Sequence, residues 1–135
     1  MSLTFYKDFR IAVENKFEAM TLSANKVFTN TPFNPQGLAD GAGFVRLVIG
    51  HNGGEHAGSG DIPIFKYEGI LFFEIHIQEK KGAALLDTLA DQLRNEWKNK
   101  QFDCITTKAD TLKKADIRDG FALWVFSVPF SSFKN

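Results

Sequence analysis

The sequence predicts an α+β domain in which two helices pack on one face of a mostly antiparallel sheet of about four to five strands. Two segments repeat apolar residues every three or four positions, which is the period of an amphipathic helix. Other segments alternate apolar with polar residues, as strands with one buried face do. The elements follow the order helix, short strand, strand, long loop, strand, helix, strand, long loop, strand. This order is typical of an antiparallel sheet with its helices on one side.

The first half of the chain predicts one helix and two strands. Thr4 to Met20 carries Phe, Val and Met residues at helical spacing, which predicts a helix docked on the sheet. Lys26 to Thr29 predicts a brief strand, and the alternation from Phe44 to Ile49 predicts a longer one. Arg46 lies inside this second strand, which indicates a face reached by solvent or by a partner carboxylate.

The stretch from Asp61 to Trp97 carries the longest apolar strand and the second helix. From Leu71 to Ile77 the odd-numbered residues are all apolar, whereas the even-numbered ones become polar towards the end. This pattern predicts a strand that is covered on one side and partly covered on the other. After Gly82, Leu and Trp residues recur at spacings of three and four. The resulting helix has only the sheet against which to bury its apolar stripe.

Two further strands and two long connections complete the prediction. Phe102 to Thr107 predicts a short strand, and Phe121 to Phe130 predicts the last one. Gly50 to Gly60 is rich in glycine and Lys108 to Gly120 is rich in charge, so both are predicted to be loops. The first is expected to project from a hairpin as a binding segment or a disordered tip. The sheet face opposite the helices holds Phe, Ile and Val, which suggests that another subunit covers it.

Length and composition indicate a single domain over residues 1–135. The chain has 16 basic and 16 acidic residues, and neither half is polarised, which argues against binding to nucleic acid or an anionic membrane. No apolar run approaches the ~20 residues of a membrane span, and the N-terminus lacks the layout of a signal peptide. The single cysteine, Cys104, cannot form an internal disulfide. We therefore expect folding in a cytoplasm, with Cys104 as a buried structural thiol in its strand.

No motif in the sequence indicates catalysis or cofactor binding. His51, Glu55, His56 and Asp61 share the glycine-rich segment, but a flexible loop does not orient metal ligands as a helix does. The glycines do not form a phosphate-binding motif. Asp87 and Asp91 share a helix face that is predicted to lie in solvent. The sequence therefore predicts no metal site and no cofactor, and its function has to be inferred from architecture and resemblance.

Several short motifs follow one another in a fixed layout. They are the N-terminal amphipathic helix (Phe5 to Met20), N-T-P-F-N-P (Asn30 to Pro35), F-V-R-L (Phe44 to Leu47), G-S-G (Gly58 to Gly60), Y-E-G-I-L-F-F-E-I (Tyr67 to Ile75), K-G (Lys81, Gly82), A-D-Q-L (Ala90 to Leu93) and V-P-F (Val128 to Phe130). In this layout the chain resembles the tail terminator proteins of long-tailed bacteriophages, typified by the minor tail protein U of lambda. Many such relatives carry a proline and a glycine where this chain has Glu79 to Gly82.

The resemblance implies a structural role, and a protein that is not an enzyme. Such proteins form a six-fold ring on the end of the completed tail tube, stop its polymerisation and present a surface to the head-side connector. The implied partners are other copies of the chain, the tail tube protein and the connector protein. The implied location is the virion tail, after assembly in the cytoplasm of a bacterial host. No contact with nucleic acid or membrane is required.

The contacts of this ring are expected on the two predicted loops and on charged residues near them. The candidate interface residues are Arg46, His51, Asn52, Glu55, His56, Asp61, Lys66, Lys113 and Arg118. Two alternatives remain open, namely a neck or head-completion connector and a small cytosolic binding protein or enzyme with a pocket between helices and sheet. Self-association into rings would favour the tail terminator or the connector. Specific stabilisation by a small ligand would favour the binding protein or enzyme.

Overall fold

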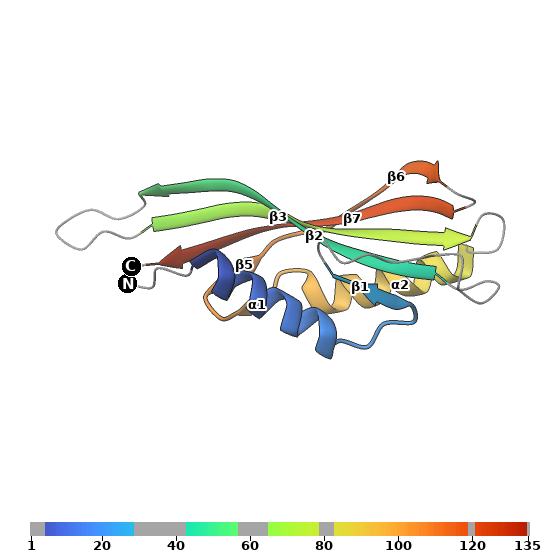
Figure 1. Ribbon diagram of the computed structural model, residues 1–135, viewed down its shortest axis with the longest axis horizontal. Coiled ribbons are helices and arrows are strands. Elements are labelled where there is room, and N and C mark those ends of the chain that lie inside the picture. The colour runs from blue at the N-terminus through green and yellow to red at the C-terminus, as the bar shows by residue number, and fades with distance from the viewer. Residues whose placement is uncertain (1–4, 29–42, 57–64, 79–82, 119–120, 135) are drawn as a thin grey trace.

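The computed structural model describes residues 5–28, 43–56, 65–78, 83–118 and 121–134. These residues form two layers, a long twisted sheet and two helices packed on one of its faces (Figure 1). The helices are α1 (Phe5–Ala19) and α2 (Ala83–Trp97), and the strands are β1 (Asn25–Val27), β2 (Gly43–His56), β3 (Phe65–Gln78), β4 (Gln101–Phe102), β5 (Ile105–Thr107), β6 (Thr111–Arg118) and β7 (Phe121–Lys134).

The predicted fold class is wrong, because the sheet is larger than expected and mixed. It has seven strands in the order β1-β2-β3-β7-β5-β4, and β6 also pairs with β7. The short β1 runs parallel to β2, whereas the other paired strands are antiparallel. The whole sheet curls into a half-barrel. The predicted strand number is too low for two reasons. The single strand predicted over Phe102–Thr107 is two strands, β4 and β5, and the polar β6 was predicted to be a loop because it carries little periodic signal.

Both predicted loops contain strand residues. Gly50–His56 continues β2 and pairs with β3 from Phe65 to Ile70, with an irregularity between His51 and Gly54. Pairing with β3 outweighs the weak intrinsic preference of glycine for strands. Within Lys108–Gly120, β6 pairs with β7 along seven of its residues. Its polar composition is that of an edge strand, which is exposed to solvent on most sides.

The two helices and the apolar face of the central strand are confirmed. Each helix begins and ends within one residue of the predicted bounds. The odd-numbered residues of β3 from Leu71 to Ile77 are at most 5% exposed and pack on both helices. Asp87 and Asp91 are exposed on α2, as predicted. Among the described residues, neither helix is long and apolar enough to cross a membrane.

The predicted strand from Phe102 to Thr107 is interrupted by a tight turn. Asp103 and Cys104 connect β4 to β5, and both have positive φ angles, of 45° and 65°. Cys104 is exposed, so the prediction of a buried thiol is wrong. The chain reverses direction at this residue, which turns its side chain away from the core.

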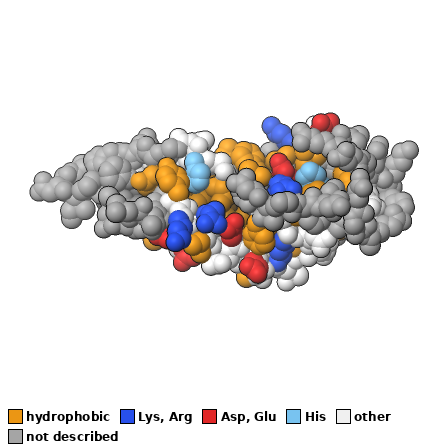
Figure 2. Space-filling view, viewed as in Figure 1, with side chains coloured by type: hydrophobic (Ala, Val, Ile, Leu, Met, Phe, Trp, Pro, Cys, Tyr) orange, Lys and Arg blue, Asp and Glu red, His pale blue; other side chains and the backbone are white. Residues whose placement is uncertain are grey.

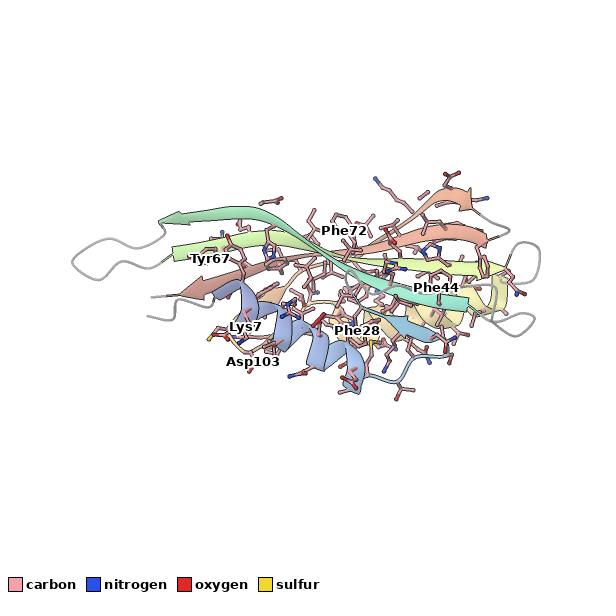
Figure 3. All side chains as sticks on the ribbon, in the orientation of Figure 1. Lys7, Phe28, Phe44, Tyr67, Phe72 and Asp103 are labelled. Atoms are coloured by element: carbon pink, nitrogen blue, oxygen red, sulfur yellow. The ribbon has the colours of Figure 1, made fainter. Side chains whose placement is uncertain are left out.

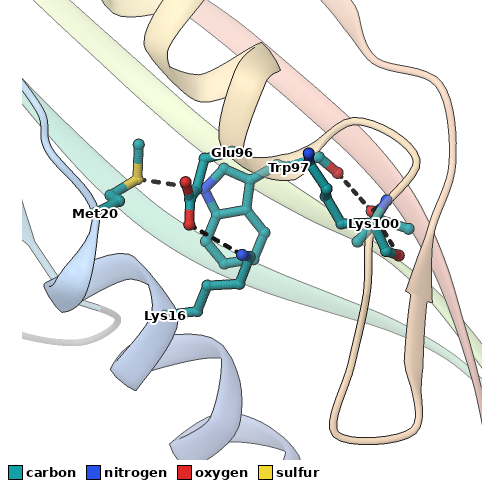
Figure 4. Close-up of polar contacts among 6 residues, drawn as sticks. Lys16, Met20, Glu96, Trp97 and Lys100 are labelled. Carbon is teal, nitrogen blue, oxygen red and sulfur yellow. Dashed lines mark hydrogen bonds and ion pairs between the residues drawn. The ribbon is translucent and has the colours of Figure 1, made fainter.

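A cluster at the end of α2 ties the two helices to the sheet (Figure 4). Lys16 of α1 forms an ion pair of 2.9 Å with Glu96 of α2, and its Nζ lies 5.4 Å from the centre of the Trp97 ring. The buried hydroxyl of Thr107 donates a hydrogen bond to the Trp97 carbonyl and accepts one from the Lys100 amide. Because the last carbonyls of a helix lack partners within it, Thr107 completes the end of α2.

Candidate assembly interface

The two faces of the sheet differ in what covers them. Residues of β3 with odd numbers point to the helices, and those with even numbers point to the other side. Phe72 lies on the side away from α1 and α2 (Figure 3). Strand register places side chains of β2 and β7 next to it, since Val48 and Ser127 are its cross-strand partners. We call this side of the sheet the outer face.

Five apolar residues form the centre of the outer face. We call them the outer-face patch: Val48, Ile70, Phe72, Val125 and Pro129. All five are half-buried. Neighbouring strands are about 4.8 Å apart, so side chains at these register positions are contiguous. Hydrophobic side chains reach the upper surface at the middle of the molecule in Figure 2. Among the described elements, both helices lie on the opposite face, so neither covers the patch.

Three of the predicted interface residues surround this patch. Arg46 lies opposite Glu74 in the β2–β3 register. Lys66 forms an ion pair of 2.8 Å with Glu68, and its hydrogen bond lowers the pKa of that carboxyl. Both pairs therefore place a cation beside an anion at the border of the patch.

The third residue, Lys113, lies opposite Val125 in the β6–β7 register and is exposed. An apolar centre with charged residues around it is the usual arrangement of a protein–protein interface.

His51 lies on the other face and is not part of this border. Its ring centre is 4.9 Å from that of Tyr6, 5.5 Å from that of Phe9 and 6.3 Å from that of Phe130. The imidazole stays exposed on one side, but its partial burial lowers its pKa from the usual 6.5. The prediction that His51 projects from a loop is wrong, because it belongs to a paired strand and packs under the start of α1.

Four of the remaining predicted residues lie towards the two ends of the sheet. Asn52 is exposed in β2 beside the strand irregularity. The backbones of Glu55 and His56 pair with β3, and that of Arg118 pairs with β7, but the structure does not describe these three side chains. Asp61 lies outside the described residues. In the described parts of the chain, no group of three His, Cys, Asp or Glu side chains is placed to hold a metal ion.

A second surface, which the sequence did not indicate, lies between α2 and β6 on the helix side of the sheet. We call it the α2/β6 groove, with a volume of about 400 Å³ and lined by Asp87, Ala90, Asp91, Arg94, Asp110, Leu112 and Phe126. The four α2 residues recur at spacings of three and one, so they share one helix face. Leu112 is 37% exposed, and Arg94 contacts Asp110 at 3.3 Å. No local sequence pattern indicated this surface, because Leu112 lies in a stretch that the sequence predicted to be a polar loop.

The described residues form a small sheet-and-helix domain in which neither helix covers the outer-face patch, and a groove lies on the opposite side of the sheet. No family model matches the chain, and no curated protein matches it. A solved structure of a hypothetical protein is similar, with a TM-score of 0.63 and 16% sequence identity over 98% of this chain and 96% of that one. At this identity the similarity concerns the fold alone.

Proposed function

We propose that this protein is a structural component of a phage or prophage tail. In this role it is a tail terminator, which forms a ring on the end of the tail tube, stops polymerisation of the tube and provides the surface for head joining. Its partners are other copies of the chain, the tail tube protein and a head-side connector. Its place is the virion tail, after assembly in the bacterial cytoplasm.

The observation that carries this proposal is the outer-face patch. A sheet in a two-layer domain normally buries its apolar side chains against a second layer. Here both helices cover one face, and the half-buried outer-face patch, with charged residues around it, lies on the other. Such a surface is typical of a protein that buries it in an assembly. The short motifs from Asn30 to Phe130, which resemble those of tail terminators, indicate which assembly this is.

The first experiment deletes the gene in its parent phage or prophage and images the particles by electron microscopy. Overlong tails without heads are expected, because nothing ends the growth of the tube. Normal-length tails lying apart from full heads would instead identify a neck connector. Intact virions would overturn both structural roles, and a screen for stabilising small ligands would then test the binding-protein alternative.

Complementation links this phenotype to the patch. Phe72→Lys places a charge in the centre of the outer-face patch, where an assembled ring would bury it without a partner. We expect this variant to fold, because Phe72 lies outside the core cluster, and to fail to restore normal tails. Glu18→Lys on the exposed side of α1 is the matched control. Normal tails with Phe72→Lys would remove the support that the patch gives to the proposal.

A further inference from the structure

A closed ring of identical subunits joins two different surfaces of each copy, since a head-to-tail contact repeats from one copy to the next. We propose that the outer-face patch of one copy docks on the α2/β6 groove of the next copy. This inference rests on the proposed function, which supplies the ring, and it names the two surfaces that the ring joins.

The positions of the two surfaces suit a head-to-tail contact. Phe72, in the outer-face patch, lies on the side of the sheet away from the helices (Figure 3), and the strand register places the other patch residues on the same side. The α2/β6 groove lies on the helix side, since Leu112 is opposite the core residue Phe126 in the strand register. The surfaces therefore face in opposite directions, so that a copy bound through one of them leaves its other one open for the next copy.

The apolar parts of the two surfaces match in kind. Leu112 is one of the few large apolar side chains described as exposed, at 37%. It lies beside Ala90 and Phe126 in the groove. Docking would cover it with the half-buried Phe72 and Val125 of the neighbouring copy. Removal of these side chains from water is the favourable term that such a contact requires.

The charged parts of the two surfaces are complementary. Asp87 and Asp91 are exposed at the groove, and neither has an ion-pair partner among the described residues. The third acid of the groove, Asp110, is already held by Arg94. At the outer-face patch, Lys113 is exposed and likewise has no described ion-pair partner. The two aspartates of one copy therefore offer the opposite charge to Lys113 of the next, which sets the register of the contact.

A charge-reversal experiment on the full chain tests this docking. The mass of the assemblies is measured by sedimentation over a range of protein concentrations, and negative-stain images show whether rings form. The variant Asp87→Lys/Asp91→Lys and the variant Lys113→Glu are each expected to raise the concentration for half-assembly roughly tenfold or more, because each places like charges together. The combination of all three substitutions restores opposite charges and is expected to recover most of the assembly.

Two controls separate docking from folding and from net charge. Circular dichroism confirms that each variant is folded, as expected for exposed positions. Glu18→Lys and Lys100→Glu reverse exposed charges away from both surfaces and are expected to leave the assembly unchanged. If the wild-type ring forms, and neither Asp87→Lys/Asp91→Lys nor Lys113→Glu weakens it, the proposed docking is wrong although the protein forms a ring. If the wild type stays monomeric alone and on purified tail tubes, the docking and the ring are overturned together.

Discussion

Substitution of Gly69 by Ala tests how closely the strands approach at the point where α1 begins. A Cβ atom at Gly69 would overlap the carbonyl oxygen of Gly50 on β2 and lie 2.7 Å from two ring atoms of Phe130 on β7. The ring has little freedom to move, since it is 2% exposed and its centre lies 4.6 Å from that of Phe9. The new methyl group must therefore displace either a strand backbone or a packed core ring.

The expected loss of stability follows from these two contacts. Overpacking of a core typically costs about 1–3 kcal/mol, and a contact with backbone belongs at the upper end of this range. Removal of a glycine lowers the entropy of the unfolded chain, which stabilises the folded protein by about 0.4–1 kcal/mol and offsets part of this loss. The net destabilisation is therefore about 2–3 kcal/mol, which corresponds to a fall in Tm of roughly 6–12 °C for a domain of this size.

Urea denaturation followed by circular dichroism measures this difference. Gly50→Ala is the matched control, because its Cβ would meet the half-buried Phe72 ring at 3.0 Å, and that ring can turn away on the outer face. We expect a change within about 1 kcal/mol there. Phe130→Leu should cost less in the Gly69→Ala background than in the wild type, because the two sites share one contact. A Gly69→Ala protein as stable as the wild type would refute the close approach of these strands.

Three further predictions concern single side chains. Cys104→Gly is expected to raise the free energy of unfolding by about 1 kcal/mol, because glycine adopts the positive φ of this exposed residue without strain. Urea denaturation measures this change. A lower free energy of unfolding would mean that the thiol makes a stabilising contact. Thr107→Val keeps the shape of a 2% exposed side chain but leaves the Trp97 carbonyl without its hydroxyl donor. We expect the free energy of unfolding to fall by about 2 kcal/mol in the same assay. An unchanged urea midpoint would argue against this hydrogen bond. Burial lowers the pKa of His51 in the folded protein, so the unfolded chain takes up this proton first as the pH falls. The stability due to neutral His51 is therefore present above its unfolded pKa and lost as the pH falls through its folded pKa. The wild type should lose more stability than His51→Gln between about pH 8 and pH 5, where histidine titrates, and parallel profiles would contradict the burial.

Sequence reasoning found the elements whose signal is local. The apolar stripes of α1 and α2 repeat with the helical period, and the odd-numbered residues from Leu71 to Ile77 mark the buried face of β3. These patterns are strong because one side of each element meets the core along its whole length. The sequence also placed Arg46 correctly inside a strand, but it assigned Lys113 to a loop. It did not show that these two residues and Lys66 lie on one face of the sheet.

The elements that sequence reasoning missed depend on distant partners. Gly50–His56 has the composition of a loop, and only its pairing with Phe65–Ile70 makes it a strand. The edge strand β6 alternates weakly because little covers it on either face. The turn at Asp103 and Cys104 lacks the Asn-Gly or Asp-Gly pair that normally announces two residues with positive φ. The α2/β6 groove required knowledge that β6 crosses near α2, which no local pattern contains.

The central place of β3 has a consequence for the order of folding. Its partner β2 precedes it directly, and such a hairpin forms within about 10 μs. Its other partner, β7, follows only after α2, β4, β5 and β6, and pairing across that separation is slower because a long loop must close first. Until β7 pairs with β3, one edge of β3 is unpaired and its apolar face is exposed, so the partly folded chain is prone to aggregate with other chains. Refolding yield should therefore depend on protein concentration, since the slow closure by β7 competes with aggregation.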